Sequence, residues 1–307
     1  MSCLHNAHEP TLGLGTVQFG VPYGVSNSVG QTEPDEVREI LKVAWRAGVR
    51  CLDTAHAYGT SETVLGTTLT ADTPFNIVTK LPPLPPSLTT SSEILAWVRH
   101  TVAQSLIRLG RSSLYAVLVH HAPDAVGPHG SAILDGLRSC KESGEVTKIG
   151  VSTYEREHLE GALQTGALDL VQIPINILDQ RLLEGDILSR LRGKGVEIHA
   201  RSIFLQGLLL MSLPGLPAYF TPFLSHLEHF HNVCRNHGVS PMEMALAFIK
   251  TIPVDVAIVG VNTHEHLTEI TTAYGTNCHS LSKLDFGQFA AHEEALVNPT
   301  LWRFPSR

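Results

Sequence analysis

The sequence lacks the cysteine patterns that mark disulfide-rich proteins and zinc ribbons. Its cysteines are odd in number, no two are spaced as CxxC, and they lie far apart, at Cys3, Cys51, Cys140, Cys234 and Cys278. Small secreted domains need paired cysteines, and zinc ribbons need CxxC spacing. The cysteines therefore fit a reducing compartment and argue against both classes.

Three further absences exclude broad classes of protein. No apolar run approaches the roughly 18 residues that a membrane-spanning helix needs. No block of like charges occurs, and the net charge of −7 is opposite in sign to a nucleic-acid footprint. The N-terminal stretch MSCLHNAHEP has neither the basic nor the apolar region of a secretory signal. We therefore expect a cytoplasmic protein with no membrane or nucleic-acid partner.

The composition that remains is that of an ordinary globular protein. Of 307 residues, 43% are hydrophobic and 17% are charged, which is ample for a large core. A chain of this length could hold two domains, but no internal repeat, low-complexity tract or linker divides it. We therefore expect residues 1–307 to form a single domain.

Short apolar segments alternate with longer segments of helical period. The predicted strands are residues 11–16, 49–54, 76–80, 115–120, 147–152, 170–175, 196–202 and 255–260. The predicted helices are residues 32–48, 61–69, 91–110, 130–143, 155–164, 184–193, 241–250 and 263–273, the first with Thr32 as its N-cap. This alternation predicts parallel strands with crossover helices, and at this length a closed (β/α)8 TIM barrel of the α/β class fits best. A doubly wound sheet is the alternative, weakened because no GxGxxG follows any strand.

Two long stretches interrupt this alternation. Residues 203–235 form an excursion after the seventh predicted strand, which we expect to be a loop, and residues 281–307 form a tail after the last helix. In a parallel barrel the binding loops leave the C-terminal ends of the strands. We therefore expect the excursion and the tail to lie near the mouth of an active site.

Polar residues gather where the predicted strands end. Asp53, Lys80 and His120 terminate three consecutive strands, and Tyr58 follows Asp53 in the stretch LDTAHAYG. Further polar residues at or near strand ends are Ser152, Gln172 and Ser202. The C-terminal strand ends of a parallel barrel face one common mouth, so these side chains should converge in space.

An acid, a lysine, a histidine and a tyrosine together suggest proton transfer to an oxygen. A phenol of pKa about 10 is a poor acid at neutral pH, and a lysine cation nearby should lower that value. Asp53 could hold the ammonium of Lys80 in place, and His120 could orient a substrate oxygen. General acid catalysis of this kind is worth about 10²–10⁴ in rate. Hydride from a nicotinamide is the natural partner reagent, because no side chain is a hydride source.

The segments that carry these residues resemble the aldo-keto reductase superfamily. LDTAHAYG, VTK, SLIRLGRSSLYAVLVHHAP, GEVTKIGVS and RSIFLQGLL are similar to the family's segments, in its order, over residues 11–302. GTVQFGVPYG, QIPINILDQR and NPTLWRF are similar to a bacterial branch often associated with sugar metabolism. The resemblance implies a (β/α)8 barrel that binds NADPH or NADH in extended form. It also implies the catalytic tetrad Asp53, Tyr58, Lys80 and His120.

The resemblance further implies which residues bind the cofactor. Ser152 and Gln172 match residues that hold the nicotinamide carboxamide, and Thr16 and Asp53 are expected to contact the cofactor as well. The segment that wraps the pyrophosphate corresponds to Ser202, Phe204, Gln206 and Gly207. The turn that receives the adenosine phosphate, a placement that the donors of a helix N-terminus favour, corresponds to Gly260, Asn262 and Thr263.

Three positions depart from the common family pattern. Thr153 stands where an asparagine usually follows the serine, and Arg201 stands where an aromatic ring often stacks on the nicotinamide. The stretch VNTHEHLTEI contains no Arg or Lys, although a bidentate cation would be the natural discriminator for the 2′-phosphate of NADP. The choice between NADP and NAD stays open at this point, and family habit favours NADP(H).

Four residues are candidates for the substrate pocket. Phe19, Tyr23 and Trp302 offer aromatic walls, although a tail tryptophan could equally pin the tail to the barrel. His121 could line the pocket or simply solvate its loop. The expected substrate is a small carbonyl compound or a sugar, and its identity, the physiological direction and the oligomeric state are left open by the sequence.

The predicted function is an NAD(P)H-dependent oxidoreductase that reduces an aldehyde or ketone, or oxidises a sugar or alcohol, with Tyr58 as general acid or base. One alternative is a cofactor-binding, non-catalytic subunit of the same fold. A second is a metal-dependent hydrolase barrel, suggested by 17 histidines and the pair His120–His121. No predicted strand carries HxH, and the pairs His5/His8 and His264/His266 fall on the N-terminal arm and a predicted helix start, so we predict no metal.

Overall fold

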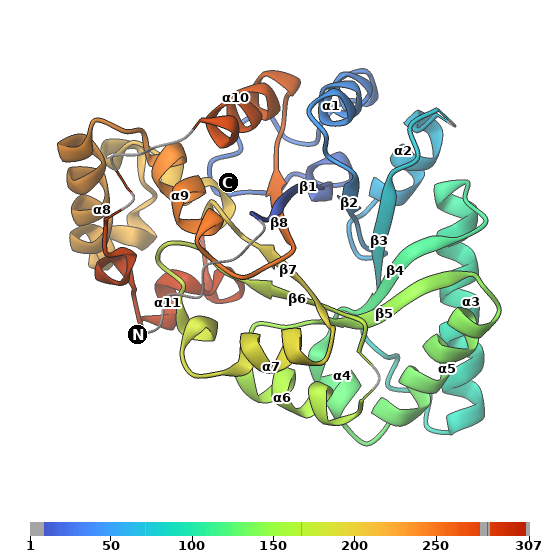
Figure 1. The fold of residues 1–307 in the computed structure, drawn as a ribbon. Helices are drawn as coiled ribbons and strands as arrows, with labels where there is room; N and C mark the ends of the chain where they lie inside the picture. Colours follow the sequence, from blue (N-terminus) through green and yellow to red (C-terminus); the bar gives the residue numbers. More distant parts are fainter. Residues whose placement is uncertain (1–8, 71, 167, 277–280, 282, 305–307) are drawn as a thin grey trace.

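The chain forms a closed ring of parallel strands surrounded by helices (Figure 1). The computed structural model describes residues 9–70, 72–166, 168–276, 281 and 283–304. Strand order in the ring follows the sequence, and the last strand pairs with the first. The predicted (β/α)8 barrel is confirmed.

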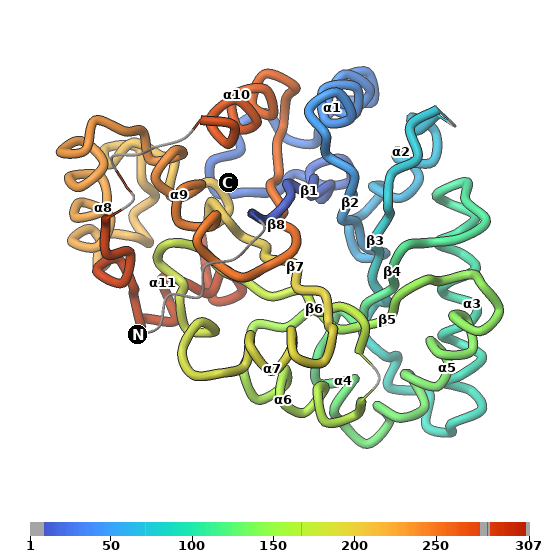
Figure 2. The backbone as a smooth tube through the Cα atoms, viewed as in Figure 1, coloured from blue at the N-terminus to red at the C-terminus, as the bar shows by residue number. Residues whose placement is uncertain are grey.

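The strands of the ring are β1 (Thr11–Gly15), β2 (Cys51–Asp53), β3 (Asn76–Leu81), β4 (Leu114–Val119), β5 (Val146–Ser152), β6 (Leu170–Pro174), β7 (Glu197–Arg201) and β8 (Val256–Gly260). Each overlaps a predicted strand, and every neighbouring pair runs parallel. The tube in Figure 2 passes from blue to red around the ring, so consecutive units of the chain are also neighbours in space.

The helices that follow the strands are α1 (Pro34–Arg46), α2 (Ser61–Thr68), α3 (Ser91–Leu109), α5 (Gly130–Glu142), α6 (Arg156–Gln164), α7 (Ile187–Gly193), α9 (Pro241–Lys250) and α10 (His264–Gly275). Additional helices are α4 (Ala122–Val126), α8 (Leu224–His237) and α11 (Glu294–Val297), with 3-10 turns that include η1 (Val17–Phe19), η3 (Leu205–Leu210), η5 (Ala218–Phe223) and η8 (Pro299–Leu301). The predicted N-cap Thr32 is wrong: α1 is capped at Glu33, because Pro34 takes the first helical position that suits its fixed φ.

Helix α3 shows how local sequence sets these boundaries. Thr90 accepts a hydrogen bond from the backbone N–H of Glu93, whose side chain reaches back to Thr90, so the two form a capping box. Gly110 ends the helix at φ +62°, a conformation that glycine adopts without steric cost. Between them the buried stripe runs through Ile94, Val98 and further residues at helical spacing.

Strand alternation divides the apolar residues into two cores. Val78, Leu118 and Ile258 face the inside of the ring and belong to a small inner cluster. Ile77 and Val117, one position away on the same strands, face the helices and belong to the large outer cluster. Because side chains on a strand alternate between faces, polar residues that continue the inner row emerge at the mouth of the ring.

The prediction that residues 203–235 form a loop is wrong. The segment contains η3, η5 and most of α8, where Leu227, Phe230 and Cys234 are buried at positions i, i+3 and i+7. The apolar stripe of LSHLEHFHNVCRNH is narrow and interleaved with histidines, which hid its helical period. The helix ends at Gly238, which has φ +66°.

The C-terminal tail packs against this excursion. Trp302 is buried, its indole N–H donates to the carbonyl of Leu296 at 3.2 Å, and its ring meets the ring of Phe220 edge-on at 4.9 Å between centroids. Tyr219 Oη donates to the carbonyl of Ala295 at 2.9 Å. The tail is therefore anchored by residues that lie about eighty positions earlier in the chain.

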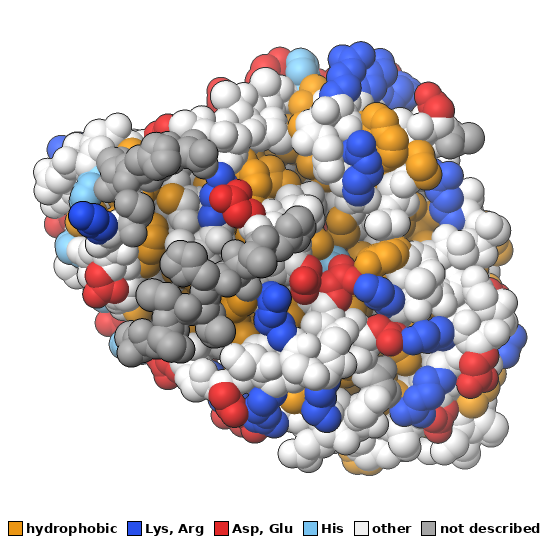
Figure 3. All heavy atoms as spheres, in the orientation of Figure 1, with side chains coloured by type: hydrophobic (Ala, Val, Ile, Leu, Met, Phe, Trp, Pro, Cys, Tyr) orange, Lys and Arg blue, Asp and Glu red, His pale blue; other side chains and the backbone are white. Residues whose placement is uncertain are grey.

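The described surface is polar and mixed in charge. On the face shown in Figure 3, basic and acidic side chains are interspersed among neutral ones. Within the described ranges, no helix combines the length and the apolar character that crossing a membrane requires.

Candidate active site

Three neighbouring strands bring an acid, a lysine and a histidine to the mouth of the ring. Asp53 is the last residue of β2, Lys80 is the second-last residue of β3, and His120 directly follows β4. Asp53 and Lys80 continue the inner row of their strands, so both side chains point into the ring. The strand-end prediction therefore places these three residues correctly in space.

Lys80 is the centre of the hydrogen-bond network. Its ammonium donates to Asp53 Oδ1 at 2.6 Å, to the carbonyl of Thr54 at 2.9 Å and to Tyr58 Oη at 3.3 Å. An ammonium has three donors, and these contacts use all of them. Because the phenol oxygen of Tyr58 accepts from Lys80, its own O–H is free to donate to a further group.

Two glycines hold the turn that carries Tyr58. A Cβ on Gly20 would lie 1.7 Å from the carbonyl oxygen of Tyr58, so no other residue fits there without moving the turn. Gly59 has φ +54°, and a Cβ there would lie 2.4 Å from the carbonyl oxygen of Gly20. This close approach of η1 and the β2–α2 turn positions the phenol over Lys80.

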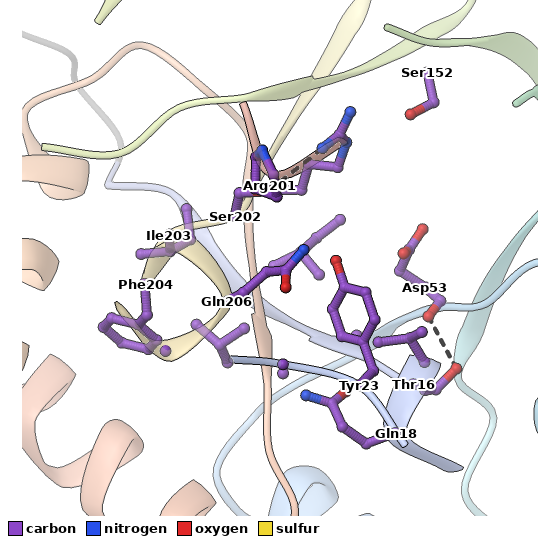
Figure 4. Close-up of a pocket in the computed structure, with 18 of the residues that line it drawn as sticks. Thr16, Gln18, Tyr23, Asp53, Ser152, Arg201, Ser202, Ile203, Phe204 and Gln206 are labelled. Carbon is purple, nitrogen blue, oxygen red and sulfur yellow. Dashed lines mark hydrogen bonds between the residues drawn. The ribbon is translucent and has the colours of Figure 1, made fainter. Parts of the chain in front are cut away.

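The other side of Asp53 is held by a second set of bonds. Gln172 Nε2 donates to Asp53 Oδ1 at 2.6 Å, and Ser152 Oγ donates to Gln172 Oε1 at 3.4 Å. Thr16 Oγ1 donates to the backbone carbonyl of Asp53 at 2.9 Å, the bond drawn in Figure 4. Oδ1 of the carboxylate thus accepts from both Lys80 and Gln172, and the backbone of Asp53 is held by Thr16.

Burial sets the protonation states of the site. It lowers the pKa of His120 to about 3, and the charges of Lys80 and Arg201 act in the same direction, so the imidazole is neutral at physiological pH. Burial also lowers the pKa of Lys80, although Asp53 opposes that shift. We expected the lysine to lower the pKa of Tyr58, but burial, followed by the charge of Asp53, raises it well above its usual range. The ammonium is already matched by Asp53, so the phenol stays protonated.

These groups open into a cavity of about 1140 Å³ at the mouth of the ring. That volume lies slightly above the usual range for small-molecule and cofactor sites, about 300–1,000 Å³. The predicted residues that line it are Thr16, Tyr23, Asp53, Tyr58, His120, His121, Ser152, Ser202, Phe204, Gln206, Gly207, Gly260 and Asn262. The C-terminal tail reaches it as well, through residues 298–300.

Five predicted residues lie outside the cavity wall. Lys80 and Gln172 lie beneath it, behind Asp53. Thr263 caps α10, where its hydroxyl accepts from the N–H of His266. Phe19 is fully buried in the outer core, and Trp302 anchors the tail. The expectation that Phe19 and Trp302 form pocket walls is therefore replaced by packing roles, because large apolar rings gain most from complete burial.

The turn after β7 has a strained backbone. Ser202, Leu205 and Gln206 have φ values of +63°, +48° and +54°, a region that residues other than glycine rarely adopt. Such strain costs about 1–3 kcal/mol per residue and tends to persist at ligand-binding sites. The turn also contacts the β1–α1 loop, because the N–H of Val25 donates to the carbonyl of Gln206 at 3.1 Å.

Gln18 is a polar residue of the wall that the sequence analysis missed. Its Oε1 is buried and has no hydrogen-bond partner among the described residues, and a Cβ on Gly260 would lie 2.8 Å from its Nε2. An unpaired buried acceptor packed closely against Gly260 fits a wall that a polar ligand covers. Together with the strained turn and the cavity volume, it fits a dinucleotide. A glutamine between Val17 and Phe19 in the run GTVQFG was the available signal.

Other residues of the wall were also missed. Tyr154 and His158 follow β5, and Ser26 lies in the β1–α1 loop. Arg201 was noted as a departure from the family pattern, but it was not predicted to bind a ligand. The guanidinium of Arg201 lies over the ring of Tyr154 at 3.9 Å from its centroid.

A carboxylate occupies the start of α10. Glu36 accepts from the backbone N–H of His264 at 2.6 Å and from His264 Nδ1 at 2.8 Å. Its hydrogen bond to the imidazole raises the pKa of His264. Glu265 and Glu269 lie on the same helix, and Glu269 lines the cavity. An anion bound at this helix end would therefore meet several carboxylates.

The histidines that line the cavity, His120, His121, His158 and His266, do not form a group that could share a metal ion among the described residues. His121 is half-exposed and its Nδ1 lies 3.0 Å from Asp124. In the described part of the chain, one group of His and carboxylate side chains is close enough to share a metal ion, Glu36, His264 and Glu265, and none of the three lines the cavity. His5 and His8 lie outside the described residues.

The chain is similar to known oxidoreductases over most of its length. Residues 11–294 match the Aldo/keto reductase family. An uncharacterized oxidoreductase of Mycobacterium tuberculosis is 30% identical over 278 residues, which cover 83% of this chain and 81% of that protein. D-threo-aldose 1-dehydrogenase of a Pseudomonas species is 26% identical over 95% of both chains, and the NADH-specific methylglyoxal reductase of Escherichia coli is 28% identical over 64% of both.

Solved structures show the same fold. An aldo-keto reductase from Bacillus halodurans in its holo form superposes with a TM-score of 0.69 at 17% identity, covering 90% of both chains. The glycerol dehydrogenase of Gluconobacter oxydans superposes with a TM-score of 0.68 at 21% identity, covering 91% of this chain and 90% of that one.

Proposed function

Because the chain belongs to the aldo/keto reductase family, we propose that it is an NAD(P)H-dependent reductase of a small aldehyde or ketone. In the reverse direction it would oxidise the corresponding alcohol or sugar. The observation that carries the proposal is the bond from Lys80 to Tyr58 Oη at 3.3 Å, which leaves the phenol O–H free beside the cavity. Relatives named as a methylglyoxal reductase and an aldose dehydrogenase support a carbonyl or sugar substrate.

Each polar side chain then has a defined task. Tyr58 donates its proton to the carbonyl oxygen, and its raised pKa keeps it in the protonated form that this step needs. Lys80, held by Asp53, donates to the phenol oxygen and stabilises the negative charge that develops there. His120 is neutral and meets the ring of Tyr58 edge-on at 5.8 Å between centroids, from where its N–H can orient the carbonyl. The bound dinucleotide supplies the hydride.

The walls of the cavity supply groups that would hold the dinucleotide. Ser152 offers a hydroxyl group on the wall, oriented by Gln172 beneath it, and the unpaired oxygen of Gln18 offers an acceptor. The strained turn at residues 202–207 and the residues Gly260 and Asn262 would accommodate the phosphates and the adenosine end. These are proposals from chemistry and from family resemblance.

For the cofactor we propose NADH rather than the NADPH that family habit suggests. A 2′-phosphate at the α10 end would meet Glu269 on the cavity wall, with Glu36 and Glu265 outside the wall at the start of the same helix, and no described Lys or Arg lines the cavity apart from Arg201. His264 and His266 offset these carboxylates only in part. Like charges this close disfavour a phosphate dianion.

Glu36→Gln tests this preference. The substitution removes one carboxylate from the start of α10 and should strengthen NADPH binding by about 3- to 10-fold, with little change for NADH. Fluorescence titration of both cofactors measures the two dissociation constants. Tighter binding of NADPH than NADH by the unmodified protein would contradict the preference.

Titration with NADH and NADPH, followed by a panel of aldehydes, ketoses and aldoses, tests the function itself. We expect cofactor binding and a loss of absorbance at the nicotinamide band with some of these carbonyls. A non-catalytic subunit would bind cofactor tightly and turn over none of them. A metal-dependent hydrolase would lose its activity on chelation and show no change at the nicotinamide band.

A further inference from the structure

We propose that Arg201 binds a carboxylate on the carbonyl substrate, so that the preferred substrates are anionic aldehydes or ketones. The inference rests on the proposed function, because it names the class of substrate for the same cavity. It starts from an arginine at the catalytic end of the cavity wall that has no carboxylate partner among the described residues.

Strand alternation directs Arg201 into the ring. Glu197, His199 and Arg201 occupy alternate positions of β7, and Ile198 and Ala200 between them belong to the outer core. Arg201 is the last residue of the strand and lines the cavity. Figure 4 shows Arg201 and Tyr23 projecting around the same space as Asp53 and Ser152.

Arg201 lacks the ion pair that other inward-facing cations have. Lys80 lies 2.6 Å from Asp53, and the partly buried Lys148 pairs with Glu197. Arg201 is also partly buried, yet no described carboxylate lies within ion-pair distance of it. Its contacts are the ring of Tyr154 and a long hydrogen bond of 3.4 Å to Ser202 Oγ.

A guanidinium in this position keeps its charge and gains from an anion. Arginine does not lose its proton in proteins, so burial leaves a cation that water only partly solvates. Burial acts to lower the pKa of Arg201, but the phenols of Tyr154, Tyr58 and Tyr23 outweigh it, so its pKa is raised. With Asp53 matched by Lys80 and His120 neutral, Arg201 gives the inner end of the cavity a net positive charge.

A planar carboxylate fits this cation better than other anions. The guanidinium offers parallel N–H donors that match the two oxygens of a carboxylate, and stacking on Tyr154 fixes the plane of that fork. One arginine balances one negative charge, whereas a phosphate dianion would require more donors. Glu155 and Glu269 also line the cavity, but neither pairs with Arg201.

The cofactor is the rival occupant, because Ser202 follows Arg201 directly and because Arg201 stands where, in the family, an aromatic ring often stacks on the nicotinamide. The electrostatic neighbours of Arg201 argue for the substrate instead. Its charge acts on Tyr58, Lys80 and His120, the groups that contact the reacting carbonyl in the proposed function. An anion at Arg201 would therefore lie beside the reacting carbon, where a substrate lies.

The test compares two aldehydes of nearly equal size, 4-carboxybenzaldehyde and methyl 4-formylbenzoate, by kcat/KM. We expect the unmodified protein to prefer the acid, and Arg201→Gln to reduce the acid-to-ester ratio by about 10- to 100-fold. Arg201→Lys should keep part of the preference, because it retains charge without the fork. Arg192→Gln removes the same charge from exposed α7 and should leave the ratio unchanged.

Equilibrium binding separates this inference from the proposed function. Calorimetric titration with benzoate and with benzamide, its neutral isostere, requires no turnover. A preference for benzoate that disappears in Arg201→Gln supports the anion site even if no carbonyl is reduced, in which case the proposed function alone fails. Equal kcat/KM for acid and ester, or no preference for benzoate, would overturn the inference. An Arg201→Gln variant that loses NADH affinity by the same factor as it loses the acid preference would assign Arg201 to the cofactor phosphates and overturn it too.

Discussion

The inside of the barrel holds two quartets of the same residue types, one at each end. At the mouth stand Asp53, Lys80, Tyr58 and His120, and near the opposite end stand Glu197, Lys148, Tyr115 and His199. The lysine lies over the tyrosine ring in both, at 4.8 Å and 4.9 Å from the centroid. Residue types alone therefore do not make a catalytic site.

The quartets differ in which side chain makes most of the hydrogen bonds. At the N-terminal end the carboxylate of Glu197 accepts from Tyr115 at 2.7 Å, from His199 at 2.6 Å and from Lys148. The phenol proton there is already used. At the mouth Lys80 makes most of the hydrogen bonds, and the phenol oxygen of Tyr58 accepts one from it rather than donating. The phenol proton remains available at the mouth, where the cavity opens, whereas at the other end Tyr115 already donates its phenol proton to Glu197.

The two quartets also differ in solvent exposure. The Lys148 and Glu197 side chains are 30% and 15% exposed, whereas those of Lys80 and Asp53 are 0% and 6% exposed. Burial lowers the pKa of Lys80, whereas the hydrogen bonds of Lys148 to Glu197 and Tyr115 outweigh burial and raise its pKa. Burial thus shifts the pKa values of Lys80, Tyr58 and His120 away from their usual ranges, as expected for groups that transfer protons.

Removing each lysine gives the largest contrast. Lys80→Met should lower kcat by about 10²–10⁴, because the phenol loses the donor that stabilises its charge. It should also lower the free energy of unfolding by on the order of 3 kcal/mol, since Asp53 is left buried with Gln172 as its remaining partner.

Lys148→Met is the matched control for that prediction. It should destabilise the fold by roughly 1 kcal/mol, because the pair is partly exposed, and should leave kcat within about threefold. Steady-state kinetics and urea titration of both variants measure the contrast. Equal losses of kcat would show that the two ends are not distinct.

Shifting the turn that carries Tyr58 tests whether its position matters. Gly20→Ala places a methyl group on the carbonyl of Tyr58, so we expect kcat to fall by about 10- to 100-fold, as a displacement near 1 Å predicts. Gly193→Ala adds a methyl group to α7 where no atom lies within 4 Å, and it should leave kcat unchanged. An unaffected Gly20→Ala enzyme would mean that the turn adapts freely.

The quartet at the N-terminal end of the barrel should instead affect the stability of the fold in acid. Burial alone would raise the pKa of Glu197, but hydrogen bonds from His199, Lys148 and Tyr115 lower it from 4.5 to about 2. The stabilisation is fully present above pH 4.5 and is lost as the pH falls toward about 2, because protonation of the carboxyl breaks these bonds.

Glu197→Gln should therefore reduce the loss of unfolding free energy between those pH values, by on the order of 3 kcal/mol or less. Urea titrations at several pH values from neutral to acid measure the slope for both proteins. An unchanged slope in Glu197→Gln would show that other carboxyl groups control acid unfolding.

The contrast between the two ends of the barrel also explains which site residues could be predicted from the sequence. Asp53, Lys80 and His120 were found because parallel strand ends share one mouth, and Tyr58 because it follows Asp53 on a short turn. The same rule passed over Lys148 and Glu197, because residues near strand starts do not face the binding loops. The direction of the Tyr58 pKa shift was wrong because burial depends on neighbours that only the folded chain brings together.

Other misses have similar causes. Helix α8 was taken for a loop because its apolar stripe is interrupted by histidines. Phe19 and Trp302 were expected in the pocket, but aromatic residues suit a core as well as a wall, and sequence does not separate the two. Whether the side chains of Gln18 and Arg201 find partners depends on their neighbours in the folded chain, so no sequence motif predicts it.

The most direct measurement is a single turnover of bound NADH with a reactive aldehyde, followed at the nicotinamide band in Tyr58→Phe and Tyr115→Phe. Both variants lose one hydroxyl beside a lysine. Tyr58→Phe should slow the step by about 10²–10⁴ while the NADH dissociation constant stays within about twofold, and Tyr115→Phe should react at the unmodified rate. Unchanged turnover in Tyr58→Phe would contradict the assignment of the proton to this phenol.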